Sequence, residues 1–189
     1  MKRIVLIVIT VALFQNVVIA QPNSSKPPQD VVLQFYNWYF KNIYLKRSEG
    51  PEIKLVNSMY QIVPDAQFKW IKNSGFFSDV FFKNQMIIYN ACNLQLKKVK
   101  IKDVEKCGCS PADYGLVKSN DCDFIFFYPW IGGQGEALNT VRIAKVSTTG
   151  NVSKVVAMIA DSEVEYSYPE VTLAKEADGW KITKIDLHY

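Results

Sequence analysis

Between residues 139 and 187, apolar side chains alternate with polar ones in short runs, which is the pattern of half-buried β-strands. Two tight turns interrupt these runs, one with Gly150 and Asn151 and the other with Asp178 and Gly179. The pattern predicts three or four antiparallel strands with one apolar face. Because such a sheet cannot stand alone, another layer has to cover that face.

Upstream of this segment, apolar residues recur at helical spacing. Residues 28–47 begin with a proline, which the first turn of a helix tolerates, and place aromatic residues on one broad face. Residues 78–98 begin with Ser78, a favourable N-cap, and carry a wide, mostly apolar stripe. A shorter helix is expected after Pro64, closed by Gly75. These helices are the natural cover for the sheet, so the sequence predicts a single α+β domain over residues 28–189.

Two further stretches have weaker patterns. Residues 52–63 are ambiguous and are interpreted as a short helix that carries Leu55 and Met59. Residues 97–106 contain five lysines offset by Asp103 and Glu105, which is typical of a solvated strand or loop; a binding patch is the alternative. Residues 107–122 are then expected to form a polar loop.

The first twenty residues differ from the rest of the chain. Lys2 and Arg3 precede a short apolar run, and small residues around Ala20 form a cleavage site. This pattern predicts a secretory signal peptide over residues 1–20, cleaved after Ala20, with residues 21–27 as a flexible lead-in; an uncleaved anchor is the alternative. No second long apolar stretch follows, so we expect a periplasmic or secreted protein with no stable membrane insertion after cleavage.

The hydrophobic fraction and the net charge bear on the number of domains and on the class of partner. The chain has 189 residues, of which 49% are hydrophobic, and this suits one domain with a substantial core. The leader carries two of the 22 basic residues and none of the 18 acidic ones, so the net charge of the remainder is +2. This near balance gives no case for nucleic-acid binding.

The cysteines lie beyond the leader, at Cys92, Cys107, Cys109 and Cys122. Export together with an even count favours two disulfides. A bond between Cys107 and Cys109 would close a very tight loop, so the favoured pairing joins Cys92 and Cys122 each to one member of that pair. The alternative is a metal site, but Cys-Gly-Cys spacing without a nearby histidine suits it poorly, and no metal is expected.

An aromatic run at residues 124–130 leads into a glycine-rich segment at residues 131–136. One interpretation is a buried strand that ends in a glycine turn. The functional interpretation is a loop that presents Tyr128, Trp130, Gln134 and Glu136 to a partner, because Tyr and Trp beside glycine make effective contacts.

Two motifs at opposite ends of the domain form a familiar pair. They are V-V-x-x-F-x-x-W-Y at residues 31–39 and D-G-W-K-I-x-x-I at residues 178–185. Together they resemble the nuclear transport factor 2-like proteins (cystatin-like, SnoaL-type). Within that group, the chain looks most like a family of small exported bacterial proteins of unknown function. In that family an Asp-aromatic segment that ends in Gln-Asp precedes the sheet. Here Asp123-Phe124 and Gln134-Gly135-Glu136 occupy the comparable place, with a glycine interrupting the second motif.

The resemblance implies a fold and a range of functions. The fold would be a cone in which N-terminal helices pack on a curved antiparallel sheet of three to four strands. Enzymes of this architecture often place Asp and His in the pocket of the cone, whereas non-enzymatic members use the sheet for dimerisation or partner binding. By analogy, the resemblance extends to small exported immunity proteins, which neutralise cell-wall-degrading effectors.

The titratable residues do not form a convincing catalytic set. The only histidine, His188, is next to the last residue. Asp161, Glu163 and Glu165 alternate, so they could share one strand face, and such a row is more often solvated than catalytic. We therefore expect no catalytic residues and no cofactor.

These observations favour an exported, non-catalytic binding protein of the bacterial periplasm. The expected partner is a cell-wall hydrolase, as for an immunity-type inhibitor, or another envelope protein, and a homodimer is also open. The alternatives use the pocket of the cone, either as a weak acid–base enzyme or as a carrier of a small ligand. For the carrier, the expected lining residues are Trp38, Phe81 and Tyr168.

Overall fold

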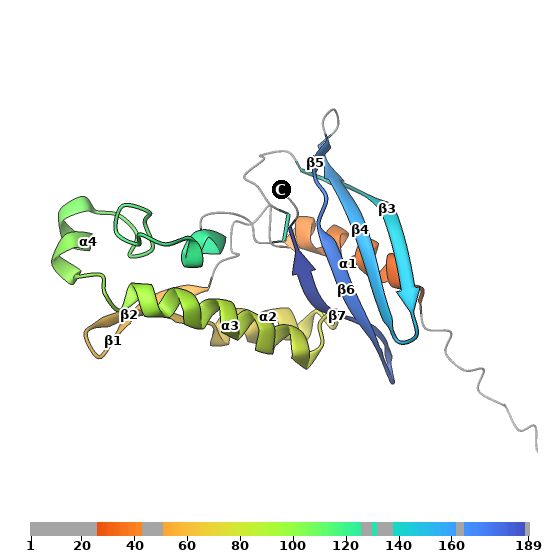
Figure 1. Ribbon diagram of the computed structural model, residues 1–189, viewed down its shortest axis with the longest axis horizontal. Helices are drawn as coiled ribbons and strands as arrows, with labels where there is room; N and C mark the ends of the chain where they lie inside the picture. Colours follow the sequence, from red (N-terminus) through yellow and green to blue (C-terminus); the bar gives the residue numbers. More distant parts are fainter. Residues whose placement is uncertain (1–25, 43–50, 126–129, 132–137, 162–164, 188–189) are drawn as a thin grey trace, which may run out of the picture.

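The computed structural model describes residues 26–42, 51–125, 130–131, 138–161 and 165–187. The elements follow one another as α1 (Pro28–Asn42), β1 (Glu52–Val56), β2 (Met59–Val63), α2 (Asp65–Asn73), α3 (Asp79–Leu96), α4 (Ile101–Cys107), the 3₁₀ helix η2 (Asn120–Ile125), β3 (Thr140–Thr149), β4 (Val152–Ala160), β5 (Glu165–Ser167), β6 (Glu170–Glu176) and β7 (Gly179–Asp186). Figure 1 shows the main sheet and α1 at one end of the molecule and α4 at the other, with α3 running between them. The expected leader and most of the lead-in lie outside the described residues.

The main sheet is antiparallel throughout, with the strand order β3-β4-β6-β7, and β5 adds to β4. Both turns that the sequence predicted are present, between β3 and β4 and between β6 and β7. Gly150 and Gly179 have φ angles of 58° and 127° there, which suit glycine because it lacks a Cβ atom. The prediction of an α+β fold with an antiparallel sheet of three or four strands is therefore confirmed for the four main strands, and the short β5 is an addition that was not predicted.

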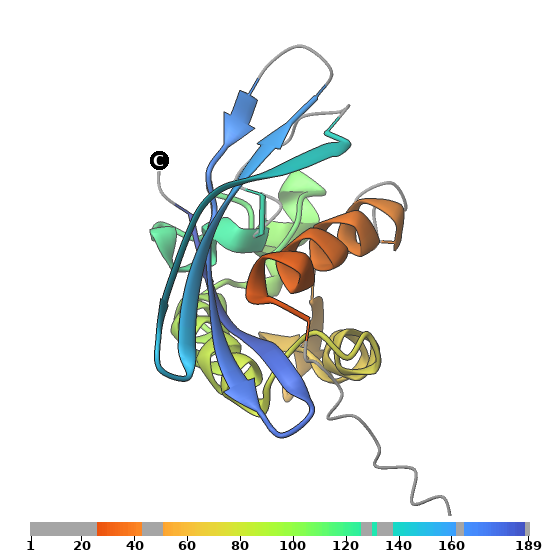
Figure 2. The same ribbon diagram turned by 90° about the vertical axis from the view of Figure 1, so that its right-hand side faces the viewer.

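One face of this sheet is buried under α1, as Figure 2 shows. Alternate residues of the strands point into that layer, among them Val155, Ala157, Val171 and Leu173, which are fully buried. From α1, the core receives Val32, Phe35, Tyr36, Tyr39 and Phe40. The predicted packing of the first helix on the sheet follows because alternation along the strands and helical spacing along α1 both bring apolar residues to this layer.

A second, smaller core lies away from the main sheet, between α3, the β1–β2 hairpin and the segment that ends in η2. Its buried residues are Ile62, Tyr89, Cys92, Leu96, Ala112, Val117 and Cys122. The 18-residue helix α3 serves both cores, because its Phe81 lies in the first and its Tyr89 and Leu96 lie in the second. None of the described helices is long and apolar enough to cross a membrane.

The sequence interpretation was wrong for two segments. Residues 52–63 form a β-hairpin rather than a short helix, and the turn residues Asn57 and Ser58 both have positive φ angles, as two-residue hairpin turns require. Residues 101–107 form the helix α4 rather than a strand or loop. Gly108 ends it in the left-handed conformation, and its N–H donates to the Val104 carbonyl.

The favoured disulfide pairing was also wrong. Cys92 pairs with Cys122, and Cys107 pairs with Cys109. Cys92 on α3 and Cys122 in η2 meet inside the second core, where both are buried. Only Gly108 separates Cys107 from Cys109, and with its left-handed conformation their Cα atoms are 5.1 Å apart, which is within the range that a disulfide needs.

Candidate functional site

The position of α3 is fixed at its first turn by Ser78. Its hydroxyl oxygen accepts the N–H of Phe81 and donates to the carbonyl of Ile182 on β7, both at 3.3 Å. The predicted N-cap is therefore confirmed, and it has a second role that the sequence did not indicate. One side chain both starts α3 and joins it to the edge of the main sheet.

The outer side of α3 is apolar although it faces solvent. Val80, Ile87 and Leu94 are 49%, 68% and 62% exposed, and Ile88 beside them is exposed as well. A spacing of seven residues is close to two helical turns, so the first three lie in one line along the helix. These four residues form what we call the α3 stripe.

The helix cannot turn to bury this stripe, because its other side is already occupied. Phe81, Tyr89, Cys92 and Leu96 are buried in the two cores. Asn84, which lies on the side of the helix next to β7, donates from Nδ2 to the carbonyl of Thr183 at 3.1 Å. The orientation of α3 is thus set from both ends, and the stripe faces outwards as a consequence.

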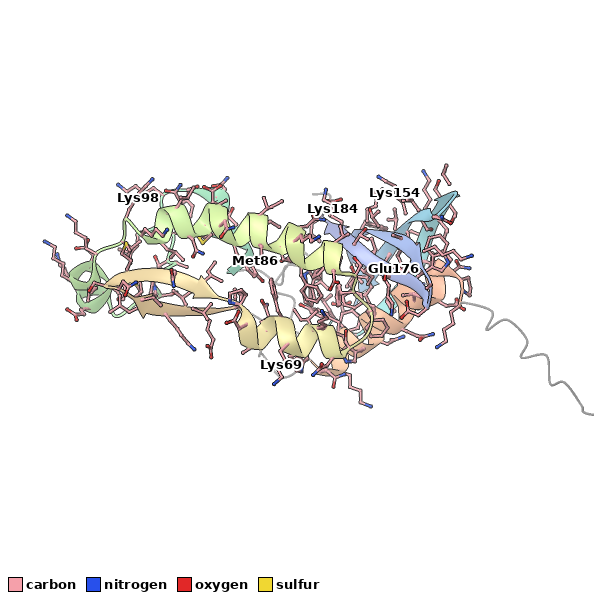
Figure 3. The ribbon with its side chains drawn as sticks, turned by 90° about the horizontal axis from the view of Figure 1, so that it is seen from below. Lys69, Met86, Lys98, Lys154, Glu176 and Lys184 are labelled. Atoms are coloured by element: carbon pink, nitrogen blue, oxygen red, sulfur yellow. A yellow bond between two sulfur atoms is a disulfide. The ribbon has the colours of Figure 1, made fainter. Side chains whose placement is uncertain are left out.

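The surroundings of the stripe are basic. Lys83, Lys97 and Lys98 are exposed on or just after α3. Figure 3 shows Lys98 beside the end of the helix and Lys184 of β7 beside its start, while Met86 points towards the hairpin and α2. Lys184 is paired with Asp186, but Lys98 bonds to the uncharged Gln95, so its positive charge is not neutralised by that contact.

The acidic residue on this helix is already engaged. Asp79 in the first turn of α3 lies 3.1 Å from Lys72 Nζ. It also lies at the positive end of the helix dipole, where a carboxylate is favourable. At the other end of the helix, the exposed Asp121 of η2 accepts a hydrogen bond from Gln95 Nε2 at 3.2 Å. Lys83, Lys97 and Lys98 outnumber this carboxylate, so the rim of the α3 stripe carries more positive than negative charge.

A surface of this kind indicates contact with another molecule. Single exposed apolar residues are normal, but contiguous apolar patches rimmed by polar residues mark interaction sites. The exposed stripe was not predicted, because the apolar positions of residues 78–98 were all interpreted as one wide face that covers the sheet. The signal was present, because α3 is apolar on more than one side, and such a helix is buried all round or covered by a partner.

The structure places Trp130, one of the four expected partner-binding residues, in the main core. It is 3% exposed and packs against Phe35, Tyr39, Phe77 and Phe81. For Trp130 this agrees with the interpretation of a buried segment rather than an exposed loop, and the other side chains of the aromatic run lie outside those that the structure describes. Tyr128, Gln134 and Glu136 lie outside the described residues.

The indole Nε1 of Trp130 is buried and has no hydrogen-bond partner within the part of the chain that the structure describes. The backbone on either side is nevertheless held in place. Tyr36 donates to the carbonyl of Trp130 at 2.9 Å, and Ser167 donates to the carbonyl of Ile131. The Trp130 side chain thus packs between α1 and the start of α3.

The residues expected to line a ligand pocket do not come together as one lining. Phe81 is buried in the main core, and Trp38 stacks on Trp70 with ring centroids 4.8 Å apart. Tyr168 is exposed beyond β5. Trp38 packs against the outside of the core that contains Phe81, and Tyr168 is exposed.

Asp161 and Glu165, two of the three acidic residues expected on one strand face, do not share a strand. β4 ends at Ala160, just before Asp161, and β5 begins at Glu165. Glu163 lies outside the described residues, as does His188. No group of three or more His, Cys, Asp or Glu side chains in the described ranges is arranged to hold a metal ion.

Comparison with known proteins adds no relative. No protein-family model matches the chain, and neither a curated protein nor a solved structure matches it. The resemblance to nuclear transport factor 2-like proteins therefore stays a prediction from the two sequence motifs.

Proposed function

We propose that this chain is an exported binding protein that associates with a protein partner through the α3 stripe. The observation that carries the proposal is the line of Val80, Ile87 and Leu94, which are held in solvent by a helix whose other side is locked into two cores. Export is inferred from the signal-peptide pattern at residues 1–20 and is supported by the two disulfides. The protein acts at this surface by binding rather than by catalysis.

The chemistry of the stripe defines the partner. Its centre is aliphatic, so it suits an apolar patch or an amphipathic helix laid along α3. Its rim carries Lys83, Lys97 and Lys98, so the partner surface should be acidic around that patch. Interfaces built in this way have an apolar centre for affinity and a charged rim for orientation.

A cell-wall hydrolase of the glycosidase type is the partner class we favour, as in an immunity-type inhibitor. Glycosidases carry a pair of carboxylic residues beside the bond they cleave, so their clefts are acidic. A basic-rimmed apolar helix complements such a cleft in both charge and shape.

The proposal is tested by comparing two double variants of the oxidised chain that starts at Gln21. Ile87→Lys with Leu94→Lys places two charges in the stripe, whereas Val146→Lys with Val152→Lys makes the same change at two exposed valines of the main sheet. Each tagged protein is used to isolate partners from the cell envelope, and the partner is then purified and titrated calorimetrically.

We expect the wild-type and control proteins to bind one purified partner with equal affinity and the stripe variant to bind at least about 100-fold more weakly, since hot-spot residues contribute about 2 kcal/mol or more. Equal binding by all three proteins would contradict the proposal. Concentration-dependent self-association that only the stripe variant loses would assign the surface to a second copy of the chain instead.

A further inference from the structure

The two disulfides of this protein differ in their burial, in the length of the loop that they close and in the elements that they join. Cys92–Cys122 is buried, joins α3 to η2 and spans 30 residues of chain. Cys107–Cys109 joins residues only two positions apart at the end of α4. Cys107 is exposed, and Cys109 is half-buried.

The fold does not depend on the bond between Cys107 and Cys109. Stabilisation by a disulfide grows with the length of the loop it closes, and here that loop contains one residue, Gly108. The end of α4 is already closed by the Gly108 N–H, which donates to the Val104 carbonyl at 2.9 Å. α4 also contributes no buried residue to either core. The bond therefore contributes little to the stability of the fold.

Backbone groups around Cys107 Sγ act on a thiolate in opposite directions. The Val104 carbonyl oxygen lies 3.3 Å from this sulfur, and Cys107 ends α4, where the helix dipole disfavours an anion; the contacts that favour a thiolate are the following. The backbone N–H of Cys109 donates to Cys107 Sγ at 3.3 Å, and a hydrogen bond of this kind stabilises negative charge on sulfur. The exposed lysines at 97, 98, 100, 102 and 106 outnumber Asp103 and Glu105 in the same segment. A positive environment stabilises thiolates, and a stable thiolate is a good leaving group.

We propose that Cys107–Cys109 is a thiol–disulfide exchange site, which accepts electrons from the paired thiols of a second exported protein. One thiolate of that dithiol attacks Cys109 Sγ, the bond to Cys107 breaks, and Cys107 leaves with the electron pair as a thiolate that the Cys109 N–H stabilises. The first thiol of the dithiol is then bonded to Cys109 in a mixed disulfide. The second thiolate of the dithiol attacks the sulfur of that first thiol, and Cys109 is released as a thiolate. The dithiol loses two electrons and two protons and becomes a disulfide, while Cys107 and Cys109 become thiols.

Cys92–Cys122 provides an internal control for the first experiment. The oxidised chain that starts at Gln21 is equilibrated in glutathione buffers of graded composition, and free thiols are trapped by alkylation and located by peptide mass mapping. We expect Cys107 and Cys109 to become reduced at a glutathione ratio about 100-fold less reducing than the ratio that reduces the other pair, because exposed, short-loop disulfides are the labile ones. Native circular dichroism should persist after this first reduction.

A second experiment measures the exchange itself. A synthetic peptide with two reduced cysteines is mixed with the oxidised chain, and its oxidation is followed by mass spectrometry. The wild type should oxidise one equivalent of peptide at least about tenfold faster than a variant with Cys107→Ser and Cys109→Ser. Replacing Lys102 and Lys106 with Glu should slow this exchange, whereas Lys118→Glu should not.

Three results would overturn the inference. The first is mass mapping that shows Cys107 and Cys109 bonded to other cysteines. The second is reduction of both disulfides together, with loss of the native fold. The third is a peptide oxidation rate equal to that of the variant without the two cysteines. None of these results depends on the α3 stripe. The exchange site and the proposed binding surface are therefore tested independently of each other.

Discussion

Tyr36 and Trp130 lie 94 residues apart in the chain, and the Tyr36 hydroxyl donates a hydrogen bond of 2.9 Å to the Trp130 carbonyl oxygen. This bond joins α1 to the short segment that precedes the main sheet. It places the indole of Trp130 against Phe35, Tyr39, Phe77 and Phe81, and the resulting aromatic cluster is the centre of the main core.

The first prediction concerns this cluster. Trp130→Ala should lower the free energy of unfolding by about 3–5 kcal/mol, because it leaves a cavity among buried rings. Urea denaturation, followed by circular dichroism, measures the loss. Trp70→Ala is the matched control, since Trp70 is partly exposed and stacks on Trp38 alone among the described rings. That control should cost about 0.5–1.5 kcal/mol. Equal losses for the two variants would show that Trp130 is not buried as described.

Ser78 gives the second prediction. Ser78→Ala should cost about 1–2 kcal/mol of unfolding free energy, because it removes both the N-cap of α3 and the bond to the Ile182 carbonyl. Thermal or urea denaturation provides the measurement. Ser78→Thr keeps the hydroxyl and should recover most of the stability, while Ser147→Ala on an exposed strand position should change it by less than about 0.5 kcal/mol. A loss that Thr does not restore would contradict the capping role.

The third prediction concerns alkaline pH. Burial raises the pKa of Tyr36 well above 10, and burial also raises the pKa of Tyr89, whose hydroxyl bonds to Gln67 Oε1. In the unfolded chain these tyrosines ionise near pH 10, so the unfolded state then binds fewer protons than the folded state. Stability is therefore fully present below pH 10 and is lost as the pH rises above it.

The slope of that loss should reach about 1.4 kcal/mol per pH unit for each of these tyrosines, as urea titrations at pH 9, 10 and 11 would show. Tyr36→Phe should remove one such contribution, although it also loses the bond to Trp130 and starts from a lower stability. A stability that stays level from pH 9 to pH 11 would be inconsistent with two buried, neutral tyrosines.

The disulfides give the fourth prediction. Replacing Cys92 and Cys122 with Ser should cost roughly 3–4 kcal/mol, since the bond closes a loop of about 30 residues and lies in the second core. Replacing Cys107 and Cys109 with Ser should cost less than about 2 kcal/mol, because that loop is minimal. Urea denaturation of both double variants tests the ranking, and a reversed order would contradict it.

Much of the fold could be predicted from local sequence signals. The two glycine turns, the N-cap at Ser78 and the alternation around Val171 and Leu173 each depend on neighbouring residues only, and all were identified correctly. The β1–β2 hairpin was missed because its turn uses Asn57 and Ser58, and neither residue indicates a positive φ angle as strongly as glycine does.

The sequence was less informative where distant segments meet. The pairing of Cys92 with Cys122 depends on how η2 packs on α3, which no local pattern encodes. The sequence around Trp130 is compatible with a buried or an exposed side chain, and the packing of α1 and the start of α3 on it is what buries it. Ile87 and Leu94 show the reverse problem, because the helical pattern gives two apolar sides and the tertiary structure buries one of them.

Site-specific photo-crosslinking is the measurement that tests the binding account most directly. A photoreactive phenylalanine analogue is placed at Ile87 in the stripe or at Val146 on the main sheet, and each protein is irradiated in the cells that export it. The account predicts one discrete adduct with another envelope protein from position 87 and none from position 146. An equal pattern from both positions, or an adduct at 87 that consists only of two copies of this chain, would contradict it.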